Sequence, residues 1–258
     1  MLIGRVYAEQ YRVEALRYEG AYGRTYKAWE IASGGLVELY VLWPEISQSS
    51  GAADRFIEVL TRLDGVRGKN VRRIGDYGVA DDQSLFFTYP LLDRPTLDHA
   101  LRSSGPMPAK RIALIGRQVA LALTQLHDEG LAHGGLTAQS VLLGGRPGAE
   151  DHVTVGLAGM SELLGRAPLP DERLQALDRD LLGLVQREGV RGGRSTSAAV
   201  PTDIHALGAM LFYSATGASL YDVLHSAVPT PAGRDRAIEA ALERVNTDLA
   251  EVVRAATS

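Results

Sequence analysis

A change in hydrophobic periodicity near residue 90 is the feature that most constrains how this 258-residue chain can fold. Before it, runs of β-branched and aromatic residues alternate with glycine-bearing turns, a pattern typical of strands. These runs are 11–16, 24–31, 36–43, 72–79 and 84–90, with one helical pattern among them at Ala52–Leu63. A strand-rich part followed by a helical part predicts an α+β protein of two lobes, joined near residues 90–95.

Helical spacing dominates the second part of the chain. Apolar residues recur along one face of Ala109–Glu129, and a short β patch follows at 140–143 and 152–155. Asp203–Thr216 is apolar nearly all round and precedes Gly217, which predicts a buried helix that stops at this glycine. Two further helices are predicted at Ala232–Arg244 and Thr247–Ala256, and 191–202 is predicted to be a mobile loop.

Composition excludes several classes of function. The chain has no cysteine, so disulfides, zinc–thiolate sites and thiol nucleophiles are ruled out. The net charge of −4 gives no case for nucleic-acid binding, and no apolar run resembles a signal peptide or a membrane span. We therefore expect a cytoplasmic protein, or the cytoplasmic domain of a larger or membrane-attached one.

Six stretches of the chain, in order, resemble segments of the bacterial serine/threonine protein kinase domain. Residues 11–30, 36–45 and 69–78 match the glycine-rich hairpin, the third strand and the approach to the fourth strand. Residues 85–101 match the fifth strand with the hinge and next helix, 126–143 match the catalytic loop, and 202–217 match a buried helix. The resemblance implies a small β-rich N-lobe at 1–92 and a larger helical C-lobe at 93–258. This C-lobe ends earlier than the family's, so either it is shortened or the sequence is a piece of a longer polypeptide.

The residues at the family's functional positions depart from its pattern. In the glycine loop the matched residues are Tyr18, Gly20, Gly23 and Thr25. The third-strand lysine that would hold ATP phosphates falls on Tyr40, and its glutamate partner falls on Val59, with Glu58 one register step away. Joint loss of both partners avoids leaving one buried charge unpaired.

The catalytic loop and the metal-binding motif depart as well. His133 matches the family histidine, whereas the arginine, aspartate, lysine and asparagine positions hold Gly134, Gly135, Thr137 and Ser140. Aspartate–phenylalanine–glycine aligns on Leu157, Ala158 and Gly159. The matched positions thus lack the carboxylate base and both magnesium ligands that the resemblance implies.

Other matched residues point to structure rather than chemistry. His127 and His133 are expected to pack and hydrogen-bond in the core, and a metal trio with His152 is disfavoured. Asp203 is expected to tether the catalytic-loop backbone and cap the buried helix. At the hinge, Tyr89 is the gatekeeper; the Pro90 carbonyl and Leu92 N–H could still receive a purine.

We therefore predict a catalytically inactive pseudokinase: not an enzyme, with no catalytic, cofactor-binding or metal-binding residues and weak or absent nucleotide binding. It would act as a scaffold or regulatory domain for a protein partner, through an exposed apolar patch on helix 52–63 or in region 160–190. One alternative is a diverged ATP-using enzyme with relocated residues, for which Lys27 is the only spare lysine nearby. Another is a small-ligand sensor that uses the vacated cleft. The oligomeric state stays open.

Overall fold

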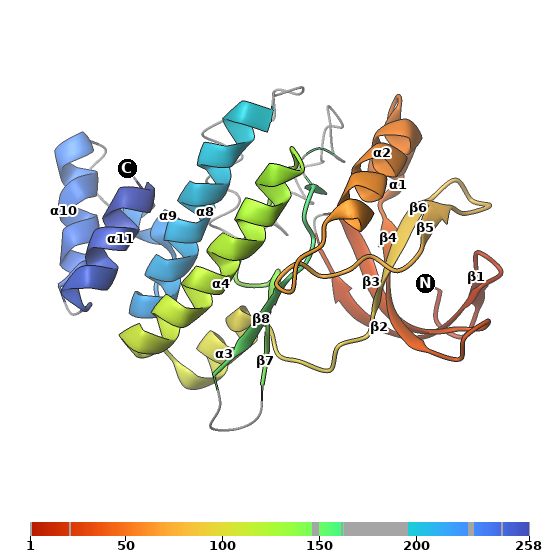
Figure 1. Cartoon of the computed structure of the whole chain (residues 1–258), viewed down its shortest axis with the longest axis horizontal. Helices are drawn as coiled ribbons and strands as arrows, with labels where there is room; N and C mark the ends of the chain where they lie inside the picture. Colours follow the sequence, from red (N-terminus) through yellow and green to blue (C-terminus); the bar gives the residue numbers. More distant parts are fainter. Residues whose placement is uncertain are drawn as a thin grey trace.

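The computed structural model describes residues 2–20, 22–145, 150–160, 162, 196–226, 230–243 and 245–257, with only the backbone of 196–199. A sheet with two helices on it forms one lobe, and a group of helices forms the other (Figure 1). The α+β, two-lobed architecture predicted from the change in periodicity is confirmed. None of the described helices is both long and apolar enough to cross a bilayer.

The first lobe is built on a six-stranded antiparallel sheet with the strand order β1-β2-β3-β4-β6-β5. Its strands are β1 (Val6–Tyr7), β2 (Tyr11–Glu19), β3 (Gly23–Glu30), β4 (Leu36–Leu42), β5 (Tyr77–Val79) and β6 (Leu85–Pro90). Successive side chains in β4 point to opposite faces, as strand geometry requires. Val37 and Leu39 enter one core, whereas Glu38 and Tyr40 face the cleft between the lobes.

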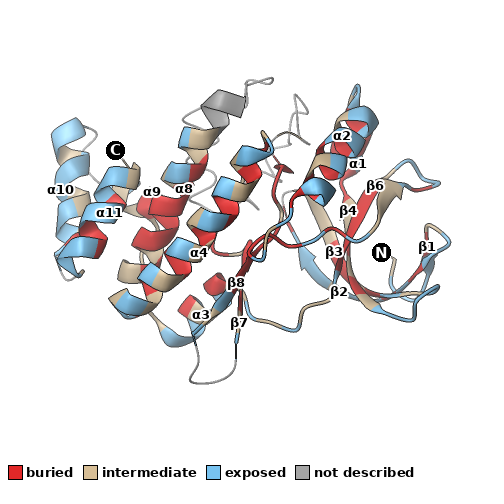
Figure 2. Ribbon diagram, in the orientation of Figure 1, coloured by how far each residue is buried: buried red, intermediate tan, exposed pale blue. Residues whose placement is uncertain are grey.

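Each face of the sheet carries a core of its own. Helices α1 (Pro44–Ser47) and α2 (Ala52–Gly65) cover one face, where Phe56 of α2 packs near Phe87 of β6. The opposite face holds a smaller core that includes Tyr11, Tyr26 and Phe86. Figure 2 shows the buried residues of α2 turned toward the sheet. Packing on both faces therefore fixes the position of the sheet.

The second lobe consists of helices and one short hairpin. The elements are α3 (Leu97–Ser104), α4 (Ala109–Asp128), β7 (Val141–Gly144), β8 (His152–Val155), α8 (Thr196–Thr216), α9 (Leu220–Ser226), α10 (Pro231–Leu242) and α11 (Thr247–Thr257). Helix α8 lies between α4 and α11 (Figure 1). Glycines permit both contacts: a Cβ on Gly116 would meet Leu211 at 2.8 Å, and one on Gly208 would meet Ala256 at 2.7 Å.

Two predicted segments differ from the structure. Residues 72–76 form no strand; instead Arg72 N–H donates to the Val155 carbonyl (2.8 Å), which ties this segment to β8. Residues 196–202, predicted to lie in a mobile loop, belong to α8, and 191–195 lie outside the described residues. Helix α8 ends as predicted, because Gly217 has a φ of 73° and its N–H donates to the Tyr213 carbonyl (2.8 Å).

Candidate functional site: the cleft between the lobes

A cleft of about 910 Å³ lies between the sheet of the first lobe and the second lobe. Its sheet side includes Tyr18, Tyr40 and Phe87, and its opposite side includes Asp98, Thr137 and Leu157. Several matched functional positions come together in this cleft. They are the glycine loop, the third-strand lysine, the catalytic-loop aspartate and asparagine, and the first position of the metal-binding motif. The residues at these positions are Tyr18, Gly20, Gly23, Thr25, Tyr40, Gly135, Ser140 and Leu157. The positions matched by the resemblance therefore meet in one cleft.

The hairpin over the cleft is closed between β2 and β3. Gly20 N–H donates to the Gly23 carbonyl (2.9 Å), and a Cβ on Gly23 would lie 2.1 Å from the Val41 carbonyl oxygen, so a glycine is required there. The Trp43 indole N–H donates to the Gly20 carbonyl at 2.9 Å. This loop is therefore fastened to the chain that follows β4.

At the lysine position, Tyr40 belongs to an aromatic cluster. Its ring stacks on Phe87 with centroids 4.8 Å apart and meets Tyr89 edge-on at 5.7 Å. Burial raises the pKa of the Tyr40 phenol, so the hydroxyl is neutral at physiological pH. Val59, at the matched partner position, is buried, whereas Glu58 is exposed. A register slip that would bring Glu58 into the cleft therefore does not occur.

An arginine that the sequence analysis overlooked reaches the hinge. Arg72 Nη2 donates to the Pro90 carbonyl (3.0 Å) and pairs with Glu38 of β4 at 2.6 Å. Its guanidinium carbon lies 4.2 Å from the centroid of the Tyr89 ring. Only 6% of the Arg72 side chain and 13% of the Glu38 side chain are exposed, so this pair is shielded from water.

This pair changes what the hinge can offer. The resemblance implied that the Pro90 carbonyl would accept a hydrogen bond from a purine, and in the structure it already accepts one from Arg72. The signal for this pair in the sequence was Glu38, a charged residue within the otherwise uncharged strand "LVELYVL". The partner could not be read from the chain, because Arg72 is 34 positions away in the sequence.

The catalytic-loop stretch is held by one buried carboxylate. The Asp203 side chain accepts hydrogen bonds from the backbone N–H groups of His133 and Gly134, both at 2.8 Å, and its Oδ2 lies 2.9 Å from His127 Nε2. Tethering by Asp203 is therefore confirmed. Capping is wrong, because α8 begins at Thr196 and Asp203 lies inside the helix.

His133 is fully buried and structural in its contacts. Its Nε2 lies 3.0 Å from the Gly156 carbonyl oxygen, while Nδ1 has no hydrogen-bond partner. Burial lowers the pKa of the His133 imidazole, so the ring is neutral in the folded protein. His152 is exposed on β8, and the described residues contain no group of three His, Asp or Glu side chains that could hold a metal ion.

The remaining catalytic-loop positions make local contacts. Ser140, at the asparagine position, donates from Oγ to the Thr137 carbonyl (2.8 Å) and accepts from Thr137 N–H (3.2 Å). Leu157, at the first position of the metal-binding motif, adopts a φ of 61°, and its N–H donates to the Tyr89 hydroxyl (3.0 Å). The Ser140–Thr137 bonds stabilise the loop, and the Leu157–Tyr89 bond connects the segment after β8 to β6.

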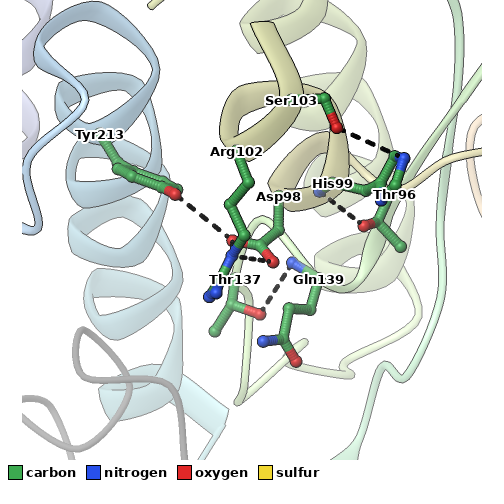
Figure 3. Close-up of polar contacts among 8 residues, drawn as sticks. All are labelled: Thr96, Asp98, His99, Arg102, Ser103, Thr137, Gln139 and Tyr213. Carbon is green, nitrogen blue, oxygen red and sulfur yellow. Dashed lines mark hydrogen bonds and ion pairs between the residues drawn. The ribbon is translucent and has the colours of Figure 1, made fainter. Parts of the chain in front are cut away.

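A polar cluster forms the wall of the cleft opposite the sheet (Figure 3). Asp98 in the first turn of α3 pairs with Arg102 (2.9 Å) and accepts a hydrogen bond from the Tyr213 hydroxyl of α8 (3.4 Å). Thr96 caps α3 by accepting from His99 N–H at 3.1 Å. These residues lie beside the catalytic-loop position Thr137, but none of them falls on a matched functional position in the sequence.

Comparisons with known proteins agree with this geometry, although no family model matches the chain. The chain is 26% identical over 220 residues to the serine/threonine-protein kinase pkn3 of Myxococcus xanthus, and 29% identical over 201 residues to the serine/threonine-protein kinase PkaA of Streptomyces coelicolor. The alignments cover 83% and 74% of this chain but only 39% and 35% of those proteins. The chain thus spans well under half the length of these relatives.

Solved structures share the fold. A double mutant of the kinase domain of Mycobacterium tuberculosis PknI superposes with a TM-score of 0.68 at 17% identity, over 100% of both chains. Rad53 residues 1–466 in complex with AMP-PNP gives a TM-score of 0.69 at 14% identity, over 96% of this chain and 60% of that one. At these identities the likeness concerns the fold.

The two lobes, the cleft between them and the tethered loop define a protein-kinase-like domain. Its relatives in sequence are bacterial serine/threonine protein kinases, as the resemblance implied. The expectation that the chain is not an enzyme is contradicted by this finding, because the relatives are named as kinases and point to an enzymatic function. The prediction rested on individual side chains, whereas relatedness concerns the whole domain.

Proposed function

We propose that this kinase-like domain is a regulatory, protein-binding domain whose lobes are held together by its own side chains rather than by a nucleotide. The observation that carries the proposal is the Arg72–Glu38 pair at the hinge, with the Pro90 carbonyl already bonded. A purine that took the place of this guanidinium would separate Arg72 from Glu38 and leave Glu38 with the more distant Arg17, whose Nε lies 3.6 Å from it. Breaking such a buried pair costs roughly 3–5 kcal/mol.

Contacts between the lobes support the same proposal. Tyr89 of β6 accepts from Leu157 N–H, and the Arg72 and Val155 backbones are bonded at 2.8 Å. Arg62 of α2 donates to the Gly130 carbonyl, just after α4, and lies 3.3 Å from Glu162. A domain fastened in one arrangement offers a fixed surface to a partner, and preorganisation of this kind lowers the entropic cost of binding.

The partner is proposed to be a protein, and the setting the cytoplasm, in keeping with the cysteine-free sequence. Of the two docking surfaces predicted from sequence, α2 exposes one large hydrophobic side chain, Ile57. Nearly all of region 160–190 lies outside the described residues.

A nucleotide-binding experiment tests the proposal. Melting temperature is measured with millimolar MgATP, ATP with EDTA, and no nucleotide, for the wild type and for the double variant Arg72→Val, Glu38→Ala. We expect a wild-type shift below about 1 °C, and a larger shift for the variant, because ligand binding stabilises by mass action. A magnesium-dependent shift of several degrees in the wild type would overturn the proposal.

The second candidate function is phosphoryl transfer, which the names of the relatives favour. A purine could use the position of the Arg72 guanidinium at the Pro90 carbonyl only if Arg72 moved, and a cation would have to replace the missing lysine. Lys27, the spare lysine considered for this role, pairs with Glu14 at 3.0 Å on the sheet. Transfer of labelled phosphate to a protein substrate that Lys27→Met abolishes and Lys110→Met leaves intact would establish this function.

A further inference from the structure

A second hollow lies behind the hinge and shares Arg94 with the lining of the cleft. It has a volume of about 550 Å³ and is formed by the segment 66–73, the hinge 90–94 and β8. Its cationic lining residues are Arg67, Lys69, Arg72, Arg73 and Arg94, with His152 at β8. Among the residues that the structure describes, no Asp or Glu lines it.

This concentration of positive charge contrasts with the rest of the chain, whose net charge is −4. Arg72 is turned inward and paired with Glu38, which leaves four cations for the hollow. Arg67, Lys69 and Arg73 are exposed, and Arg94 is half-buried. Within the described part of the chain, Lys69, Arg73 and Arg94 form no ion pair, so their charges are available to an anionic ligand.

The walls of the hollow are held by hydrogen bonds from the backbone and from the Asn70 side chain. Val155 N–H donates to the Asn70 carbonyl (2.7 Å), and the Asn70 side-chain amide donates to the Val153 carbonyl (2.8 Å). In Figure 1 the chain between α2 and β5 runs past β8, where Val71 and Val155 form an isolated bridge. Gly144 leaves space for Arg94, because a Cβ there would lie 2.6 Å from Arg94 Nη1. The cations therefore project from a fixed frame.

The floor between the cations is apolar. Val66, Val71, Pro90 and Leu92 contribute to it, and Val66 and Val71 are buried. A single small anion would leave the apolar floor and part of the positive charge unused, because the cations are spread over 67–73 and Arg94. A peptide with several carboxylates and one apolar side chain would satisfy both the charges and the floor.

We propose that this hollow is a docking site for an acidic, Asp/Glu-rich segment of a protein partner. The inference rests on the proposed protein-binding function and names the chemistry of the partner. Charge complementarity favours a peptide over a nucleic acid, because phosphate backbones need an extended basic surface and the remainder of this molecule is net acidic. Binding through such rim charges must weaken as salt rises.

The test uses fluorescence anisotropy with three labelled probes: a 12-residue Glu/Asp peptide containing one leucine, the same peptide with Gln and Asn in place of the acids, and a 12-nucleotide RNA. The test variant is Arg67→Glu, Lys69→Glu, Arg73→Glu. The matched control is Arg117→Glu, Arg234→Glu, Arg236→Glu, which makes the same charge change at exposed positions of α4 and α10. A Gln version of the test variant covers the case in which the Glu version fails to fold.

We expect the acidic peptide to bind the wild type and the control, and to bind the test variant at least tenfold more weakly. Affinity should also fall about tenfold between 50 and 300 mM salt. Equal binding by the test variant and the control, no binding of the acidic peptide, or preference for the RNA would overturn the inference. These outcomes leave the proposed function standing, because that function fails only on the magnesium-dependent nucleotide response described above.

Discussion

At the residue scale, Tyr40 and Tyr89 carry aromatic and polar contacts beside the cleft. Tyr40 stacks on Phe87 where a lysine is expected, and Tyr89 carries both the Arg72 guanidinium on its face and the Leu157 N–H on its hydroxyl. Leu157 holds a left-handed φ of 61°, which is costly for a residue of this type. The Tyr89 hydroxyl therefore helps to keep a strained residue in place.

Tyr89→Phe tests this contact. The substitution preserves the ring under Arg72 and removes only the acceptor of the Leu157 N–H, so the free energy of unfolding should fall by about 1–2 kcal/mol. Urea denaturation measures the change. Tyr77→Phe is the matched control, because its hydroxyl meets Thr61 at 3.1 Å on the exposed surface, and it should cost less than about 0.5 kcal/mol. Equal costs for the two variants would contradict the role of Tyr89.

His133 predicts a pH dependence of stability. Burial lowers its pKa in the folded state below the unfolded value of about 6.5. The folded protein thus binds this proton more weakly, so the stabilising contribution is complete above pH 6.5 and is lost as the pH falls from there through the folded-state pKa. The loss should approach 1.4 kcal/mol per pH unit at most, roughly.

The measurement compares urea unfolding at pH 7.5, 6.5, 5.5 and 5.0 for the wild type and His133→Gln. Other titrating groups are shared by both proteins, so the difference between the two curves isolates His133. The wild type should lose its advantage as the pH drops. Parallel curves over this range would show that the neutral imidazole is not a requirement of the fold.

At the scale of elements, the hairpin over the cleft depends on one close backbone approach. A Cβ on Gly23 would come within 2.1 Å of the Val41 carbonyl oxygen, and a backbone atom cannot move aside as a flexible side chain can. Gly23→Ala should therefore lower the free energy of unfolding by about 2 kcal/mol or more. Gly65→Ala is the control, because nothing lies within 4 Å of a Cβ there and alanine favours the end of α2. A Gly23 variant as stable as the control would contradict the close approach.

The elements that the sequence predicted well are those with a strong periodic pattern. Helices α2 and α4 and strands β2, β3, β4 and β6 lie where the alternation or the helical spacing placed them. Residues 72–76 have the β-type composition of a strand but form none; the chain meets β8 through the bridge at Val71 and the Arg72 N–H, tertiary contacts that local pattern does not encode. Helix α8 starts at Thr196, seven residues before Asp203, and includes Pro201.

The sequence indicated which segments meet at the candidate site, but not which side-chain contacts form around it. Matched positions brought Tyr18, Tyr40, Gly135 and Leu157 to one cleft, since they follow from the order of strands and loops along the chain. The Arg72–Glu38 pair and the Asp98–Arg102–Tyr213 cluster depend on contacts between elements far apart in sequence. A single sequence shows each of these charges, but not the partner that each will meet.

At the scale of the whole molecule, the two lobes are joined at several points around the cleft. Asp203 connects α8 to His127 of α4 and to the loop at His133 and Gly134. Arg62 connects α2 to the C-terminal end of α4, where unpaired carbonyls carry partial negative charge. The Asp203 contacts order the second lobe, whereas the Arg62 contacts join the second lobe to the lobe that carries the sheet.

Arg62→Ala tests whether this joint couples the lobes. The variant removes the guanidinium from the Glu129 and Gly130 carbonyls and from Glu162, whose side chain is 30% exposed, so a modest loss of about 1–2 kcal/mol is expected. Hydrogen exchange should accelerate both in the last turn of α2 and at the end of α4, on opposite sides of the cleft. The matched control is Arg254→Ala, which breaks an exposed pair with Glu239 inside the second lobe. That control should change exchange only near α10 and α11. Faster exchange on one side of the cleft alone in Arg62→Ala would mean that the two lobes open independently, and that the domain is not fastened as one body.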